Sequence, residues 1–441
     1  RKAIELKPNF ADAHSNLANI LLDLGNFQEA ELSTRKAIEL NPDHPDAHFN
    51  LGKILIELGK LKEAGLSTRK AIELNPDFAD AYYNLGTILH KQGNLQKAEI
   101  STRKAIELNP DFADAHINLG NIFKNMGKLQ EAETSTRKAI ELKSDSIAAH
   151  YLLGAILESN GKLEEAKNSY ENVKILDPKK NLDFTFATLS LKTKDTKNSL
   201  LQLDKLLKKD QTNTTFLAYK TIALRGNNQF DEAEKLINFS EFVKKIDSND
   251  IIDDDLIQFN KSFRDSLLVD PRRKKEENEA GWAIRGGTVI RQLLNDIRNP
   301  FISKFKSILS KAIDNYVREL PANSDHPFLI NEIEKLTIRD CWANFLEPGD
   351  FQLNHIHING WLSGVYYLDE PIVETDKENA GWIQFNQSGD NLPNFGDKRG
   401  LQVIKPEVGM FILFPSYIWH GTIPFSAPYI RASISFDINI K

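Results

Sequence analysis

The sequence predicts a multidomain protein in which an all-α solenoid precedes a β-rich barrel. Three observations support this prediction. The first part of the chain repeats with a period of 34 residues, because the hexapeptide RKAIEL recurs at positions 1, 35, 69, 103 and 137. After Pro321 the sequence changes to short β-type runs separated by turn signals. Charged segments without the 34-residue rhythm lie between these parts, and 441 residues are enough for two to three domains.

The composition is that of an ordinary globular protein. Hydrophobic residues make up 41% and charged residues 27% of the chain. The formal net charge of −6 gives no indication of a nucleic-acid partner. Neither an apolar run of membrane-spanning length nor a signal peptide is visible, so we expect a cytoplasmic protein without a membrane partner. The single cysteine, Cys341, excludes an internal disulfide framework and a cysteine-rich zinc site.

Each 34-residue unit has the pattern of two packed helices. In the unit 11–44, Gly25 ends the first helix because glycine adopts positive φ at low cost. Ala30 and Ala37 on the second helix are small enough for close helix contact, and Pro42 ends that helix. A period of 34 residues with this pattern is typical of tetratricopeptide repeats.

The sequence resembles the tetratricopeptide family through five clear units spanning about 11–180. The stretch 204–236 is similar to degenerate units, so we expect the solenoid to cover 1–236. Such arrays stack into a curved solenoid with a concave binding face. The sequence therefore predicts a protein or peptide partner for this part of the chain.

An asparagine recurs at one position of successive first helices. In related arrays this position faces the concave groove, where a carboxamide can pair with one C=O and one N–H of an extended peptide. The recurrence resembles the asparagine ladder of O-GlcNAc transferases and suggests a peptide groove. Alternatively, asparagine is simply common and solvated at this repeat position. The residues concerned are Asn16, Asn50, Asn84 and Asn118.

Residues 237–280 are expected to form a junction, because IDSNDIIDDDLIQFN is acidic and DPRRKKEENEAG is charged. We assign 281–441 to the barrel domain. Its first part, WAIRGGTVIRQLL and NPFISKFKSILSKAIDNYVREL, predicts a turn and two amphipathic helices that buttress the barrel. An alternative for part of this stretch is a helix pair that caps the solenoid.

Short runs with β character follow these helices. Their number and spacing predict a sandwich or a jelly-roll barrel, that is, a double-stranded β-helix. The runs are KLTIRDCWANFL, WLSGVYYLDE, GWIQFN, GLQVI, GMFILFP and IRASISFDINI.

Three histidines and an arginine lie in or beside these runs. His355 and His357 are two residues apart, so they point to the same face of an extended segment. His420 ends the run FPSYIWH, and Arg431 lies in the last apolar strand. Together these side chains could hold a metal ion and an acidic cosubstrate.

These motifs resemble the Fe(II)- and 2-oxoglutarate-dependent oxygenases, and most closely a prolyl-hydroxylase-like bacterial group. The matching segments are HIHINGWLSGVYYL, AGWIQF, LFPSYIWH and RAS, within 336–438. The resemblance implies a dioxygenase that hydroxylates its substrate with Fe(II), 2-oxoglutarate and O2. It implies that His420 binds iron and that Arg431 pairs with the distal carboxylate of 2-oxoglutarate. Ser433 and Tyr367 are then candidates for further hydrogen bonds to that carboxylate.

The first motif departs from the family pattern, because most relatives carry His-x-Asp or His-x-Glu there. Both His355 and His357 could bind iron, or one could bind together with a carboxylate such as Asp350 or Asp369, or the site could be inactive. An inactive site would leave a non-catalytic tetratricopeptide scaffold with a degenerate barrel. We favour the enzyme, because a buried arginine is costly unless its charge has a partner.

Overall fold

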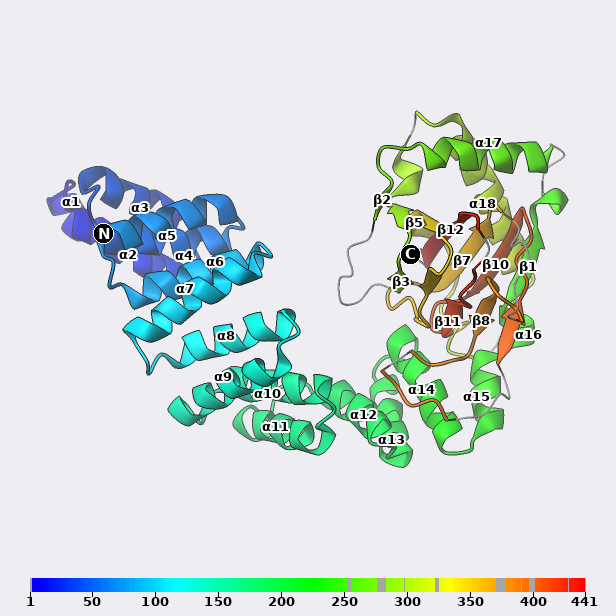
Figure 1. Cartoon of the computed structure of the whole chain (residues 1–441), viewed down its shortest axis with the longest axis horizontal. Helices are drawn as coiled ribbons and strands as arrows, with labels where there is room; N and C mark the ends of the chain where they lie inside the picture. The colour runs from blue at the N-terminus through cyan, green and yellow to red at the C-terminus, as the bar shows by residue number, and fades with distance from the viewer. Residues whose placement is uncertain are drawn as a thin grey trace. The chain divides into compact units, whose positions relative to one another are not determined.

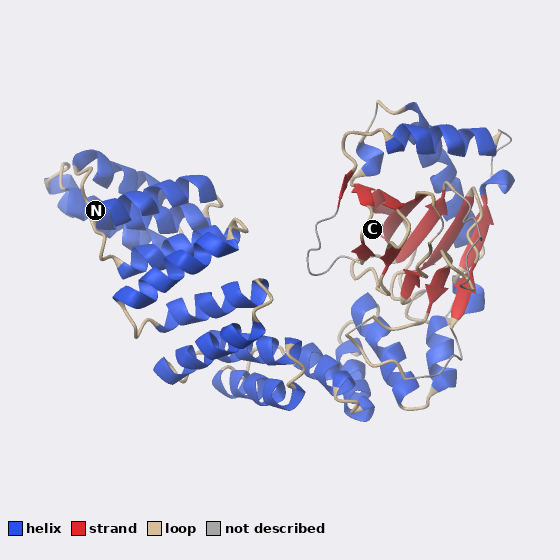
Figure 2. Ribbon diagram, in the orientation of Figure 1, coloured by secondary structure: helices blue, strands red, loops and turns tan. Residues whose placement is uncertain are grey.

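The computed structural model describes residues 2–251, 255–275, 283–296, 298–321, 325–369, 378–389, 391–395, 401–426 and 428–440. The chain forms two compact units, Arg1–Leu182 and Asp183–Lys441 (Figure 1). In the described part of the first unit every regular element is a helix, whereas the second unit combines helices and sheets (Figure 2). No helix in the described ranges is long and apolar enough to cross a membrane.

The first unit is a series of antiparallel helix pairs, one pair for each 34-residue repeat. This arrangement confirms the predicted solenoid. The helices are α1 (Lys2–Leu6), α2 (Ala11–Asp23), α3 (Phe27–Leu40), α4 (Pro45–Glu57), α5 (Leu61–Leu74), α6 (Ala79–Lys91), α7 (Leu95–Leu108), α8 (Ala113–Asn125), α9 (Leu129–Leu142), α10 (Ile147–Ser159) and α11 (Leu163–Leu176).

Small residues let the two helices of a repeat pack closely. Ala30 and Ala37 on α3 are completely buried, in agreement with the sequence pattern. On α6, Gly86 lies so close to Thr102 of α7 that a Cβ atom would overlap the threonine hydroxyl. Gly25 has a φ of 75° and follows the end of α2, as expected for a helix-terminating glycine.

The second unit begins with further helices and continues into the sheets. Its helices are α12 (Asp183–Lys192), α13 (Thr196–Leu207), α14 (Thr214–Gly226), α15 (Phe230–Ile237), α16 (Phe239–Phe242), α17 (Leu256–Leu268) and α18 (Pro300–Arg318). Its strands are β1 (Lys244–Asp247), β2 (Lys274–Lys275), β3 (Ile284–Arg285), β4 (Thr288–Ile290), β5 (Leu336–Leu346), β6 (Phe351–Gln352), β7 (Leu362–Tyr367), β8 (Ile383–Phe385), β9 (Gln402–Ile404), β10 (Met410–Pro415), β11 (His420–Thr422) and β12 (Arg431–Ile440).

The strands form one large sheet and two small ones. The large sheet has the order β1-β10-β7-β12-β5-β4-β2, and its neighbouring strands are antiparallel. A three-stranded sheet has the order β11-β8-β9, and β3 pairs with β6. Strand β12 lies at the centre of the large sheet, and its residues from Arg431 to Ile438 are buried. Polar residues in this strand therefore need partners within the protein.

Helices α17 and α18 pack their aromatic side chains against the large sheet. Phe305 of α18 lies 5.3 Å from the Tyr366 ring and 6.3 Å from the Phe411 ring, measured between centroids. Phe263 of α17 lies 5.7 Å from Phe305. These rings belong to the main hydrophobic core of the unit. The helices therefore leave the opposite face of β7 and β12 to the polar site described below.

The strands predicted from the six β-type runs are observed as β5, β7, β8, β9, β10 and β12. The helix predicted from WAIRGGTVIRQLL is wrong for the described residues 283–294, which form β3, β4 and a short 3-10 turn. Gly286 and Gly287 both have positive φ, 80° and 70°, which breaks a helix. The β-branched residues that follow favour an extended strand. The helix predicted over NPFISKFKSILSKAIDNYVREL is observed as α18.

Candidate metal centre

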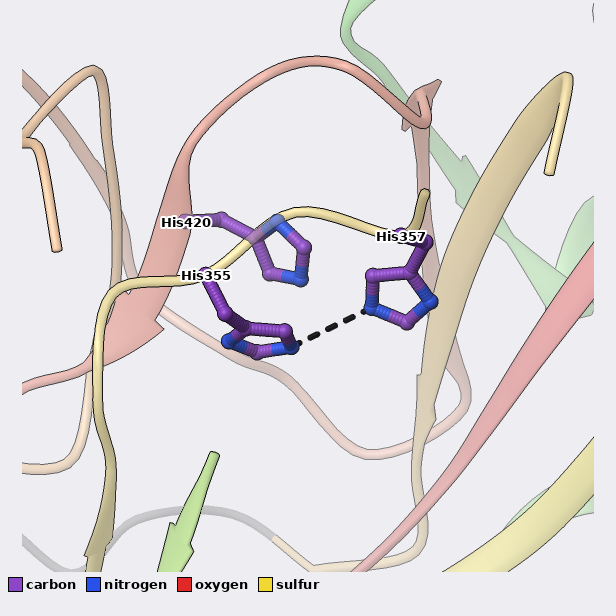
Figure 3. Close-up of side chains that lie close together, drawn as sticks. All are labelled: His355, His357 and His420. Atoms are coloured by element: carbon purple, nitrogen blue, oxygen red, sulfur yellow. Dashed lines mark hydrogen bonds between the residues drawn. The ribbon is translucent and has the colours of Figure 1, made fainter. Parts of the chain in front are cut away.

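The side chains of His355, His357 and His420 converge on one another (Figure 3). His355 and His357 follow β6, and His420 begins β11. The backbones of His355 and His420 form a two-bond antiparallel bridge, with N···O distances of 2.8 and 3.0 Å. One ring nitrogen from each histidine lies within 4.8 Å of the other two, which is compact enough to surround one metal ion.

Each ring is oriented by a hydrogen bond from its Nδ1 atom. In His355 and His420, Nδ1 lies 2.8 Å from the Leu353 carbonyl and 3.0 Å from the Ile418 carbonyl, respectively. In His357, Nδ1 lies 2.6 Å from Asp437 Oδ1. Carbonyl and carboxylate oxygens only accept hydrogen bonds, so each Nδ1 carries a proton and donates. Nε2 is thereby left with a lone pair in the neutral ring, as a metal ligand requires.

The Nε2 atoms of His355 and His357 face each other, and neither carries a proton to share. His355 Nε2 lies 3.2 Å from His357 Nε2, and both atoms are lone-pair donors in the tautomers set by Nδ1. Burial, followed by the nearby His357, lowers the pKa of His355 to about 3. Burial likewise holds the pKa of His420 well below its usual value. A cation at the centre would relieve the repulsion between these lone pairs.

A polar row on β12 faces the same cavity as the histidines. Residues two apart on a strand share a face, which brings Arg431, Ser433, Ser435 and Asp437 together. Arg431, Ser433 and Ser435 line a small cavity together with the three histidines. Asp437 accepts a hydrogen bond from Nδ1 of the His357 ring. Strand β12 therefore carries Asp437, which holds the His357 ring in place, and Arg431, whose positive charge suits a negatively charged ligand.

Arg431 has the features of an anion-binding residue. It is 3% exposed, yet its Nε and Nη1 atoms have no hydrogen-bond partner among the residues that the structure describes. Its guanidinium carbon lies 5.1 Å from the centre of the Tyr367 ring. Burial lowers the pKa of Arg431 and raises that of Tyr367 to about 12. Because unpaired buried donors are costly, these groups fit a carboxylate ligand.

The backbone on both sides of Arg431 is held by an ion pair. Arg264 of α17 donates to Asp369 at 2.7 Å and to the Ile430 carbonyl at 3.2 Å. Asp369 in turn accepts a hydrogen bond from the Ala432 N–H at 2.8 Å. Burial raises the pKa of Asp369 even though Arg264 acts to lower it. Asp369 therefore serves the start of β12 and not the histidine cluster.

Asp350, the other carboxylate considered from the sequence, is also placed elsewhere. Its Oδ2 atom accepts a hydrogen bond from the Glu347 N–H at 2.8 Å within a turn. Among the described residues, the group able to surround a metal contains His355, His357 and His420 without a carboxylate. The geometry thus favours the three-histidine alternative over one that uses Asp350 or Asp369.

The sequence reasoning missed Asp437 and Trp342. Burial acts to raise the pKa of Asp437, but His357 and a hydrogen bond from Ser363 lower it below its usual value. The Trp342 ring stacks on His357 with centroids 5.7 Å apart. The alternation in RASISFD could have revealed Asp437, because it shares the face of Arg431 at a distance of six residues.

The recurrent asparagines of the solenoid have partners inside it. Asn50, Asn84 and Asn118 are 5–8% exposed, whereas Asn16 is exposed. The Asn84 amide nitrogen donates to Thr68 Oγ1 at 3.2 Å, and that of Asn118 donates to Thr102 Oγ1 at 3.3 Å. Each of these two carboxamides therefore uses a donor to connect neighbouring repeats.

Comparisons with known proteins agree with both parts of the chain. Residues 340–437 match the family described as "Putative 2OG-Fe(II) oxygenase". This range contains the three histidines, Arg431, Ser433 and Asp437. Tetratricopeptide-repeat families match residues 11–44, 34–65, 52–93, 79–112, 113–146 and 147–180. No curated protein matches the chain.

Several solved structures are similar to part of the chain. The pilF protein of Pseudomonas aeruginosa is 22% identical, with 46% of this chain and 92% of that chain covered and a TM-score of 0.42. YrrB, described as a TPR protein with an unusual peptide-binding site, is 26% identical, with coverages of 40% and 92% and a TM-score of 0.34. TTC0263, described as a thermophilic TPR protein of Thermus thermophilus, is 24% identical, with coverages of 38% and 93% and a TM-score of 0.35. These TM-scores are low, so the assignment rests on the family matches. The chain thus joins tetratricopeptide repeats to a segment, 340–437, that matches the family described as putative 2OG-Fe(II) oxygenases.

Proposed function

We propose that the protein is an Fe(II)- and 2-oxoglutarate-dependent dioxygenase that hydroxylates a protein or peptide. One observation carries the proposal. Three histidines with Nδ1 anchored and Nε2 converging share a cavity with the buried guanidinium of Arg431, whose Nε and Nη1 have no partner within the described ranges. A metal ion needs the three converging Nε2 atoms, and a dicarboxylate needs the guanidinium. The residues present therefore fit both implied groups.

We propose that His355, His357 and His420 hold the iron. The Asp437 carboxylate accepts a hydrogen bond from Nδ1 of His357, which fixes the tautomer and the orientation of the ring. Asp437 also supplies a negative charge close to a site that lacks a carboxylate ligand. With it, the charges of Fe(II), 2-oxoglutarate and Arg431 balance within a buried region, as a low-dielectric site requires.

We propose that Arg431 binds the distal carboxylate of 2-oxoglutarate. Its buried guanidinium offers several N–H donors in one plane, including those on Nε and Nη1, for charge-assisted hydrogen bonds to a carboxylate; the ammonium of a lysine cannot reproduce this planar geometry. Tyr367 and Ser433 line the same cavity and can add hydroxyl donors. When Fe(II), 2-oxoglutarate and O2 are bound, they would supply the oxidation of a substrate C–H bond to an alcohol. This oxidation is coupled to the decarboxylation of 2-oxoglutarate to succinate and CO2.

We further propose that the large sheet and the three-stranded sheet together form the double-stranded β-helix of this family. The placement of the site residues supports this proposal, because His420 belongs to the small sheet while Asp437 and Arg431 belong to the large one. The cavity is lined by residues of both sheets, including Ile383 of β8 and Phe414 of β10.

The repeats are proposed to recruit the substrate. Tetratricopeptide repeats generally bind proteins or peptides, and this array is regular over its matched units. Because Thr68 and Thr102 hold the amide nitrogens of Asn84 and Asn118, we propose that the carboxamide oxygens accept hydrogen bonds from backbone N–H groups of an extended peptide.

The test of the proposed function is metal and cosubstrate binding under anaerobic conditions. Wild-type protein should bind Fe(II) and then 2-oxoglutarate, and should form succinate slowly when O2 is admitted without a substrate. Arg431→Met should retain Fe(II) and lose 2-oxoglutarate binding. A wild-type protein that binds neither Fe(II) nor 2-oxoglutarate would instead support the non-catalytic scaffold.

A further inference from the structure

Helix α14 is joined to the strand that carries His420 by a closed ring of hydrogen bonds. Arg225 of α14 donates through Nη1 to the Asn386 carbonyl at 2.6 Å. The Asn386 N–H donates to the Trp419 carbonyl at 2.7 Å. Trp419 Nε1 donates back to the carbonyl of Ala218 on α14 at 3.1 Å. The ring thus starts and ends on one helix and passes through the residue directly before His420.

The turn at Asn386 sets where the β8–β11 ladder ends. Asn386 has a φ of 68°, in the left-handed region that asparagine adopts more readily than other non-glycine residues. Asn386 directly follows Phe385, which is paired with His420 in the β8–β11 ladder. A change in this turn would therefore displace the strand against which His420 is held.

Arg225 is well placed to fix that turn. Its side chain is 13% exposed, and its Nη2 atom donates to Glu234 of α15 at 2.9 Å. The planar guanidinium therefore has one donor fixed on the helices and another on the Asn386 carbonyl. A second link runs from the Tyr417 hydroxyl to the Leu236 carbonyl of α15 at 2.8 Å. The segment before His420 is thus attached to both helices.

We propose that Arg225 is a positioning residue for the His420 metal ligand, so that helices α14 and α15 support the metal centre. The inference rests on the proposed function, because it takes His420 to be a ligand. Arg225 does not touch the cavity of the histidines and acts through Asn386 and Trp419. Its effect should therefore appear in metal affinity and in the local order of the strand, not in the chemistry of the ligand atoms.

The first experiment measures Co(II) affinity of the full chain, with Co(II) as the probe and absorption as the signal. Arg225→Met keeps an unbranched apolar side chain but removes the donors to Asn386 and Glu234. Its Kd for Co(II) should rise by about tenfold, the scale seen when partners of metal ligands are lost. Arg272→Met is the control, because Arg272 pairs with Asp270 and Asp296 in the same unit. The control should bind Co(II) like the wild type.

The second experiment measures amide hydrogen exchange in the metal-free protein. The N–H groups of Asn386, His420 and His355 all donate within this network, to Trp419, His355 and His420 respectively. Their exchange should be faster in Arg225→Met than in the wild type and unchanged in Arg272→Met. Trp419→Phe removes the return bond to Ala218 and should show the same pattern, which covers the case that Arg225→Met does not fold.

The outcomes separate the two proposals. Unchanged exchange at these amides and unchanged Co(II) affinity in Arg225→Met would overturn the positioning role. Equal losses in Arg225→Met and Arg272→Met would also overturn it, because the cause would then be general stability. A wild-type chain that does not bind Co(II) would contradict the metal centre itself, and the exchange comparison would still decide the role of Arg225.

Discussion

Asp437 offers the sharpest test of how the three-histidine site is supported. The Asp437→Asn variant keeps the shape of the side chain and one acceptor oxygen but removes the negative charge. In the native protein, Asp437 Oδ1 accepts from His357 Nδ1 at 2.6 Å and from Ser363 Oγ at 2.7 Å. The charge-assisted bond to His357 would become a weaker neutral one. His357 would then be a poorer metal ligand, although its ring keeps a hydrogen-bond partner.

The expected magnitude follows from the position of Asp437 directly behind a ligand. Loss of such a partner weakens metal affinity by about 10- to 100-fold, which is about 1.4 to 2.7 kcal/mol. The assay is an anaerobic titration with Fe(II) or Co(II) against a competing chelator. Asp270→Asn is a matched control, because Asp270 is partly buried and paired with Arg272 away from the histidines. Equal metal affinity in wild type and Asp437→Asn would refute the argument that the carboxylate supports His357.

Three further predictions follow from the same geometry. Arg431→Lys should raise the apparent KM for 2-oxoglutarate by at least about tenfold, because a point charge replaces a two-donor fork; an unchanged KM would place the anchor elsewhere. His355→Ala and His357→Ala should each lose most of the bound iron, measured as metal content, whereas Asp350→Ala should retain it. Full iron content in either histidine variant would exclude the three-histidine site. Replacing Asn50, Asn84 and Asn118 together by Ala should weaken protein-substrate binding by more than about tenfold, since each lost hydrogen bond contributes about 1 kcal/mol. Succinate formation without substrate should stay unchanged. Wild-type affinity in this variant would mean that the asparagines belong only to the repeat consensus.

Local sequence patterns predicted much of the fold. The 34-residue period is a local signal that repeats, so the helix pairs of the first unit could be predicted with their ends. The longer strands carry continuous apolar runs and were equally visible. Strands β1, β3 and β4 were not predicted, because strands of two to four residues depend on pairing with distant neighbours. The segment 283–294 looked amphipathic, but its two glycines and β-branched residues favour strands.

The candidate site was predictable where the motif is local and was missed where it depends on register. His355, His357, His420 and Arg431 lie in recognisable runs, and the structure brings all four to one cavity. The role of Asp437 depends on how β12 pairs with β7, where Asp437 lies opposite Ser363. The attachment of α14 to the His420 strand joins residues about 160 to 200 positions apart. Contacts of this range leave no periodic signal in the sequence.

The most direct test of the account is the binding of iron and 2-oxoglutarate by the wild-type chain and by His420→Ala. Equilibrium dialysis under anaerobic conditions gives the iron content, and succinate formation after admission of O2 gives the turnover. The account predicts one Fe(II) per wild-type chain, 2-oxoglutarate binding that depends on that iron, and succinate formation, with all three lost in His420→Ala while the fold is retained. Full iron content and turnover in His420→Ala, or the absence of both in the wild type, would contradict it.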